Sequence, residues 1–363
     1  MPAEVRSRDR KARSLASLLR ARGFCLIFFV AGTALAQRPD SYREQARVER
    51  VVVDAYVLDS RGDPIPNLSL RDFRVRVDGK PVPLESAEWI PADEPELPAL
   101  PLEKMATDEL FDAPEHAPGR LLIFFFQTDL FVETRLMGLM RMALQARGFL
   151  DTLLPTDRVA VLSFDSHLKL RQDFTADRHR LSYAIAESIL TGSPPEPDRD
   201  AVPSLARHFD FEAARKAVTP EKALAIISKA AAPIPGAKSM FFFGWGLQTI
   251  GGMAGPNPKD IRDFKEAVPA LTAARIAIFT LDVTDADYHS LEGTLENISD
   301  ITGGTYYKTH IFPRLAIDRV RRAISGRYVL VFAKPNLPRG WHGIDVALVA
   351  RKGRVLARAA YED

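Results

Sequence analysis

Hydrophobic and polar positions change their pattern twice along this chain. From residue 48 to 89 they alternate around turn sequences at 61–64 and at Asp78-Gly79, which is typical of short antiparallel strands and a hairpin. From 120 to 326, apolar runs at 121–126, 239–243 and 275–281 are separated by amphipathic stretches, as expected of parallel strands buried on both faces and joined by helices. Alternation returns at 328–333, 342–350 and 354–361. We therefore predict an α/β domain and a small antiparallel β module built from both chain ends.

The α/β region is predicted to hold a further strand pair and six helices. The strands cover 159–164 and 167–172, and a short strand covers 305–307. The first helix should bury Leu136, Leu139, Met140, Ala143 and Leu144, which share one helical face. Gly303-Gly304 should end the fifth helix as C-cap glycines. The helices are predicted at 136–148, 177–190, 220–230, 258–271, 291–301 and 311–324.

The first 36 residues form a separate segment. Seven basic residues precede or border an apolar run from Gly23 to Ala36, which ends in Ala34-Leu35-Ala36. This pattern predicts a secretory signal peptide cleaved near Ala36, and the run is shorter than the ~20 residues of a spanning helix. We expect a secreted or periplasmic bacterial protein with no transmembrane helix after cleavage; the alternative is an uncleaved anchor. The predicted divisions are 1–36 signal peptide, 47–92 N-terminal β module, 93–119 Pro- and acid-rich linker, 120–326 α/β domain and 327–363 C-terminal strands.

Charge and cysteine content exclude several classes of protein. The chain holds 49 basic and 47 acidic residues, of which seven and two lie in the first 36, leaving 42 and 45 in the rest. Without a basic excess, nucleic-acid binding has no support. Cys25, the one cysteine, lies in the signal segment, which excludes a disulfide framework or a multi-cysteine zinc site. No GxSxG, Walker-type or HExxH motif occurs, so we predict no enzymatic activity.

Three segments resemble one family. DSRGDPIPNLSLRDFRVRVDGKPV lies within the N-terminal β region, NISDITGGTYYK covers 297–308, and SGRYVLVFAKPN with GWHGIDVALV covers parts of 325–349. Together with the order of elements, these segments resemble von Willebrand factor A (VWFA)-related secreted proteins of the acidobacterial type. The resemblance implies a doubly wound, mostly parallel sheet of order 3-2-1-4-5-6 with an antiparallel third strand and helices on both faces.

The same resemblance implies a ligand site at the carboxyl ends of the first and fourth strands. VWFA domains commonly hold a metal-ion-dependent adhesion site there, with Asp-x-Ser-x-Ser after the first strand and an Asp after the fourth. Here Gln127 stands at the Asp position of the first motif, Asp129 and Phe131 stand at its two Ser positions, and Trp245 stands at the Asp position after the fourth strand. A neutral amide and an indole cannot neutralise a hard cation, so the site is expected to be degenerate. Thr191 is the nearest candidate for the family's middle-loop threonine.

We predict an exported, non-catalytic protein-binding or scaffold protein without a cofactor, whose partner is another protein. Trp245 would either contact that partner or pack into the core. One alternative is a divalent-metal-dependent adhesin or hydrolase that holds Mg²⁺ or Mn²⁺ at a rearranged cluster of Asp129, Asp282, Asp285 and Asp287. The other is a structural envelope component that uses the β module. The expected contact surface is the set of loops 127–133, 244–246 and 282–287. The expected ligand-binding residues are Gln127, Thr128, Asp129, Glu133, Gly244, Trp245, Asp282, Asp285 and Asp287.

Overall fold

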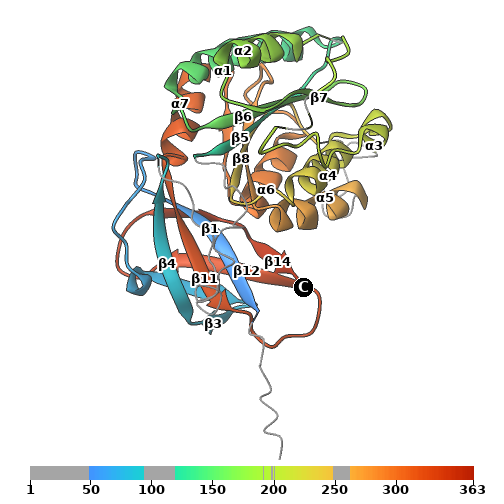
Figure 1. The fold of residues 1–363 in the computed structure, drawn as a ribbon. Helices are drawn as coiled ribbons and strands as arrows, with labels where there is room; N and C mark the ends of the chain where they lie inside the picture. Colours follow the sequence, from blue (N-terminus) through green and yellow to red (C-terminus); the bar gives the residue numbers. More distant parts are fainter. Residues whose placement is uncertain (1–48, 94–118, 191, 198, 200, 248–261) are drawn as a thin grey trace, which may run out of the picture. The chain divides into compact units, whose positions relative to one another are not determined.

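A six-stranded sheet occupies the middle of the chain (Figure 1). The computed structural model describes residues 49–93, 119–190, 192–197, 199, 201–247 and 262–363. The strands pair in parallel except for β7, which is antiparallel to β6. In spatial order they are β10 (Tyr306–Lys308), β9 (Ile276–Asp282), β8 (Lys238–Gly244), β5 (Leu121–Gln127), β6 (Arg158–Phe164) and β7 (Leu168–Thr175).

The apolar runs form the centre of this sheet because every residue of β5, β8 and β9 is buried. Phenylalanines of β5 and β8 stack across the strand pair: the rings of Phe126 and Phe243 lie 4.5 Å apart, and those of Phe125 and Phe242 lie 5.1 Å apart. Neighbouring residues of a strand point to opposite faces, so each triplet contributes to a core on both sides of the sheet.

Helices cover both faces of the sheet (Figure 1). Helices α1, α2 and α7 pack on the face that carries Phe126, and α4, α5 and α6 pack on the face that carries Phe125. The predicted mixed α/β class, with a mostly parallel sheet, is confirmed. The helices are α1 (Glu133–Phe149), α2 (Arg178–Glu187), α3 (Phe211–Arg215), α4 (Pro220–Ala231), α5 (Arg262–Ala273), α6 (Glu292–Thr302) and α7 (Pro313–Ala323), with short 3-10 turns η1 (Leu70–Asp72) and η4 (Leu150–Thr152).

The buried face of helix α1 differs from the predicted one and consists of Gly138, Leu139, Met142, Ala143, Ala146 and Phe149. Leu139 and Ala143 are buried as expected, but Met140 is 50% exposed and Leu144 is 63% exposed. The cause is a close approach at Gly138, where a Cβ atom would lie 1.7 Å from the carbonyl oxygen of Val283. Only glycine permits this distance, so Gly138 must face the sheet, and this rotation of the helix leaves Met140 and Leu144 on the outer side.

The helix ends follow local rules that the sequence partly indicated. Gly303 ends α6 in the left-handed conformation with φ of 83°, which confirms the predicted C-cap. Helix α7 begins at Pro313 rather than at residue 311, because proline is favoured in the first turn and cannot donate a helical hydrogen bond. The earlier start was therefore wrong, and Ile311 and Phe312 precede the helix. The first residues of the helix predicted at 258–271 lie outside the described residues.

Strands from both chain ends form two antiparallel four-stranded sheets (Figure 1). The Asp78-Gly79 turn joins β2 to β3 with positive φ at both residues, the geometry of a type I′ hairpin, as predicted. One sheet has the order β13 (Arg354–Ala357), β1 (Arg50–Leu58), β11 (Gly326–Ala333) and β4 (Leu84–Pro91), and the other β14 (Ala360–Glu362), β12 (Trp341–Leu348), β2 (Phe73–Val77) and β3 (Lys80–Val82).

Residues 48–363 form one compact unit. Asp54 of β1 accepts hydrogen bonds from Arg275 at 2.7 and 2.9 Å and from Arg327 at 3.2 Å, which connects the β module to the start of β9. Within the described residues, no helix is long and apolar enough to cross a membrane. The signal segment and most of the expected linker lie outside the described residues, and the divisions near 120 and 326 stay predictions.

Candidate functional site

The carboxyl ends of β5 and β8 are joined by the side chain of Gln127. This amide is 1% exposed. Its Oε1 accepts hydrogen bonds from the backbone N–H groups of Trp245 (3.0 Å) and Gly246 (3.3 Å), and its Nε2 donates to the Gly246 carbonyl at 2.8 Å. At Gly244, a Cβ atom would lie 2.7 Å from the same Oε1. Gln127 and Trp245, which replace the two carboxylates of the adhesion-site pattern, are thus joined by a hydrogen bond between the Gln127 side chain and the Trp245 backbone.

Asp129 organises the loop between β5 and α1. Its Oδ1 accepts hydrogen bonds from the backbone N–H groups of Phe131 and Val132, and its Oδ2 forms an ion pair with Arg135 at 2.7 Å. The Arg135 guanidinium lies 3.8 Å from the ring centroid of Trp245, a favourable cation–π geometry. The Asp129 carboxylate is therefore already neutralised and hydrogen bonded by its own loop.

Trp245 is only partly buried, between the two alternatives left open by the sequence. One side of the ring packs against the hydrophobic core under α1 and α7, and Arg135 lies over the ring. Its indole N–H is buried without a hydrogen-bond partner among the described residues. A buried donor of this kind costs stability, so Trp245 is not an ordinary core residue.

Thr128 links the same edge to the end of α2. Its backbone N–H donates to the Phe164 carbonyl at 2.7 Å, and its hydroxyl donates to the Ser188 carbonyl at 3.0 Å. The side chain is thereby engaged within the fold. Thr191, the expected middle-loop threonine, lies outside the described residues.

Asp282, at the end of β9, is a buried acceptor rather than an open ligand. Its Oδ2 accepts from the Tyr306 hydroxyl at 2.8 Å and lies 2.8 Å from Nε2 of His289, while Oδ1 accepts from the Thr284 N–H. Burial, together with the adjacent Asp282 charge, raises the pKa of Tyr306, which keeps this phenol a donor. The predicted residue lies at the predicted edge, but its oxygens are used within the fold.

The remaining predicted carboxylates lie on the surface of the same edge. Asp285 pairs with Arg141 of α1 at 3.3 Å, Asp287 pairs with His310 at 3.2 Å, and Glu133 is exposed at the start of α1. In the part of the chain that the structure describes, no three histidine, cysteine or acidic side chains are placed to hold a metal ion. The rearranged cluster has no geometric support there.

Exposed apolar side chains gather around this edge. Phe131 is 100% exposed, Tyr288 78%, Phe312 63% and Ile311 59%. The loops that carry them are connected, because α1 packs against α7 and the two ion pairs of Asp285 and Asp287 join α1 to the β9–α6 loop and that loop to the segment before α7. We call the set the apical patch: Leu130, Phe131, Val132, Tyr288, Ile311 and Phe312.

The expected contact loop 127–133 includes Leu130, Phe131 and Val132, but sequence reasoning missed the rest of the apical patch and the role of Arg135. Ile311 was assigned to a helix. One signal was present: Ile311 and Phe312 directly precede Pro313, where a helix start is favoured. The contact of Arg135 with Trp245 joins positions 110 apart in the sequence, and nothing in either neighbourhood indicated it.

No family model matches the chain, and no curated protein matches it. Among similar solved structures, a von Willebrand factor type A protein from Catenulispora acidiphila is 11% identical, with 82% of this chain and 74% of that chain covered at a TM-score of 0.38. An aerotolerance-related membrane protein from Bacteroides fragilis is 11% identical over 57% of this chain and 98% of its own, with a TM-score of 0.36. BatB from Bacteroides thetaiotaomicron is 12% identical over 56% and 97%, with a TM-score of 0.35.

At these identities and scores the likenesses say nothing of what this chain binds. The fold rests on the molecule itself: a six-stranded, mostly parallel sheet with one antiparallel edge strand, helices on both faces, and antiparallel sheets beside it. The mixed α/β class is thus shown by the structure, and the assignment to the VWFA type stays a prediction.

Proposed function

We propose that this chain is an exported, non-catalytic protein-binding protein that captures a partner through its apical patch. The observation that carries the proposal is the full exposure of Phe131 among other exposed aromatic and aliphatic side chains at the carboxyl edge of the sheet. Contiguous exposed apolar groups on a soluble surface mark interaction sites, and aromatic residues are enriched at interface centres. The charged side chains beside the apical patch are of both signs, so burial of apolar surface would supply most of the affinity.

The proposal includes the loss of the metal site usual in VWFA domains. Gln127 and Trp245 stand where that pattern has carboxylates, and Asp129 is paired with Arg135. A divalent cation needs several uncommitted oxygens and negative charge, and this edge offers its carboxylates to arginine, histidine and backbone N–H groups instead.

A calorimetric titration with Mg²⁺ and Mn²⁺ tests the metal-free character. We expect no saturable heat from the wild type at millimolar metal. Saturable one-site binding that Asp129→Ala removes would contradict the proposal and favour the metal-dependent adhesin or hydrolase.

Partner capture is tested by a photo-crosslinking amino acid placed at Phe131, with the same label at Val218 as the control. Val218 is also exposed, at 73%, but lies between α3 and α4. In cells of the source organism, we expect one discrete protein adduct from position 131 and none from position 218. Equal labelling at both positions would exclude the apical patch as the contact surface. So would an adduct at position 131 that persists when Ile311 and Phe312 are changed to serine.

The proposal also includes export of the protein and its kinship with secreted VWFA-related proteins of the acidobacterial type. It rests on the basic and apolar pattern of residues 1–36. N-terminal sequencing of the protein recovered outside the cytoplasm should begin at or near Gln37. A protein that keeps its first residues in the membrane fraction would instead be anchored.

A further inference from the structure

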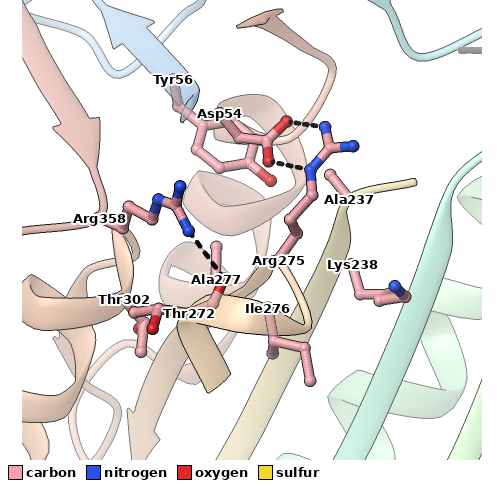
Figure 2. A pocket seen from close by; sticks show the side chains of 10 residues that line it. All are labelled: Asp54, Tyr56, Ala237, Lys238, Thr272, Arg275, Ile276, Ala277, Thr302 and Arg358. Atoms are coloured by element: carbon pink, nitrogen blue, oxygen red, sulfur yellow. Dashed lines mark hydrogen bonds and ion pairs between the residues drawn. The ribbon is translucent and has the colours of Figure 1, made fainter. Parts of the chain in front are cut away.

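A cleft lies at the end of the six-stranded sheet opposite the apical patch, where β9 begins. It has a volume of about 920 Å³ and is lined by the start of β1, the end of α5 and the last residues of the chain. A small cavity of about 20 Å³, shown in Figure 2, adjoins it and shares Thr272, Arg275 and Arg358 with it. We call the larger space the basal cleft.

Arg358 stands on the wall of the basal cleft with part of its hydrogen-bonding capacity unused. Its Nη1 donates to the Thr272 carbonyl at 2.9 Å, visible in Figure 2, and its Nη2 donates to the Val52 carbonyl at 2.8 Å. Its Nε is buried without a partner among the described residues. Burial lowers the pKa of Arg358, and the charge of the nearby Asp54 only partly opposes this shift.

Tyr361 adds an unpartnered hydroxyl to the same wall. The residue is 5% exposed, and in the described part of the chain its buried hydroxyl makes no hydrogen bond. Burial raises the pKa of Tyr361, so the phenol keeps its proton and remains a donor. An unsatisfied buried polar group in a native structure calls for an explanation, and two such donors on the wall of one cleft point to a shared acceptor.

The charges of the basal cleft favour an anion. Five basic and three acidic residues line it. Three of the basic residues are committed: Arg50 to Glu85, Arg275 to Asp54, and Lys334 to Glu49 and Asp363. Arg339 and Arg358 have no carboxylate partner within the described ranges, which leaves two cations against the single uncommitted carboxylate of Glu362.

The backbone beside the cleft favours a peptide over a small ion. Strand β13 pairs with β1 only at residues 55–58, so residues 50–54 lack a neighbouring strand on that side within the described chain. The Val52 carbonyl faces this side, where Arg358 binds it. An open strand edge is a ready partner for an extended segment.

We propose that the basal cleft binds an acidic peptide in extended form, with one carboxylate accepting hydrogen bonds from the Tyr361 hydroxyl and the Arg358 Nε, and with Arg339 adding attraction at the rim. This site is separate from the apical patch.

The test uses a fluorescein-labelled pentaglutamate peptide and the purified protein in a fluorescence anisotropy titration at low salt. Tyr361→Phe is the decisive variant, because it removes only a hydroxyl without a partner and should leave the thermal melt unchanged or slightly raised. We expect saturable binding by the wild type and about tenfold weaker binding by Tyr361→Phe, since bonds to charged acceptors are the stronger ones. Arg339→Gln should weaken binding by several-fold, about as a rim charge does.

The controls distinguish binding in the basal cleft from nonspecific electrostatic attraction between the peptide and the protein. Tyr183→Phe, a change of the same kind at an exposed position of α2, should bind as the wild type does, and added salt should weaken binding in every protein. The proposal fails if the wild type shows no saturable binding, if Tyr361→Phe binds like the wild type, if pentaglutamine binds equally well, or if citrate binds as tightly as the peptide.

Discussion

Replacing Gln127 by alanine should destabilise the protein far more than a typical surface change. The substitution removes three hydrogen bonds to the backbone of Trp245 and Gly246 at a position that is 1% exposed. Each bond contributes about 1 kcal/mol, and unsatisfied buried partners cost more. Adding the lost packing of the side chain, we expect the free energy of unfolding to fall by about 4 kcal/mol.

Urea unfolding monitored by circular dichroism measures this loss as a shift of the midpoint at constant slope. Gln145→Ala is the matched control, because Gln145 is a partly buried glutamine of α1 whose side chain makes no hydrogen bond within the described residues. It should change the free energy of unfolding by less than about 0.5 kcal/mol. If Gln127→Ala stayed within about 1 kcal/mol of the wild type, the amide would not be what holds the two strand ends together.

Three further predictions concern stability. Burial opposes ionisation of Asp54, but its two arginine partners outweigh that effect and lower its pKa to about 2. The carboxylate therefore stabilises the fold by roughly 2 kcal/mol above pH 4. Asp54→Asn should reduce the melting temperature at pH 7 but much less near pH 2. The hydrogen bond with Asp78 raises the pKa of His342, so its contribution is full below the unfolded value of about 6.5 and is lost as pH rises through the folded value; thermal melts should show this loss in the wild type and not in His342→Gln. Gly138→Ala should cost about 3 kcal/mol or more in urea unfolding, since its Cβ would overlap the Val283 carbonyl, and a neutral result would mean that α1 can move off the sheet.

Patterns with a local cause could be predicted from the sequence. The apolar runs at 121–126 and 239–243 are central strands, and Asp78-Gly79 and Gly303 adopt the conformations that their residue types favour. In each case the physical reason lies within a few residues of the position concerned. The type of these secondary-structure elements, and several of their first and last residues, can therefore be predicted from the local sequence.

The contents of the site depend on contacts between distant residues, which one sequence does not reveal. Gln127 was expected as a substituted metal position, but its bonds to residues 245 and 246 could not be foreseen. The outward turn of Met140 arises from a backbone contact between Gly138 and Val283, which hydrophobic periodicity does not contain. Asp282 was placed at the correct edge, while its engagement by His289 and Tyr306 depends on tertiary packing.

The position of β1 between β11 and β13 constrains how this protein can be made. Ala55 pairs with Tyr328 on one side and with Ala357 on the other, so a strand synthesised early must wait for nearly the whole chain before it has either neighbour. Contacts this distant in sequence form slowly, and until they form β1 presents two open edges. A chain that crosses a membrane from its N-terminus would meet the same delay on the far side, where β1 would keep two open strand edges until the C-terminal strands arrive. Truncation anywhere before residue 326 would leave that exposure permanent.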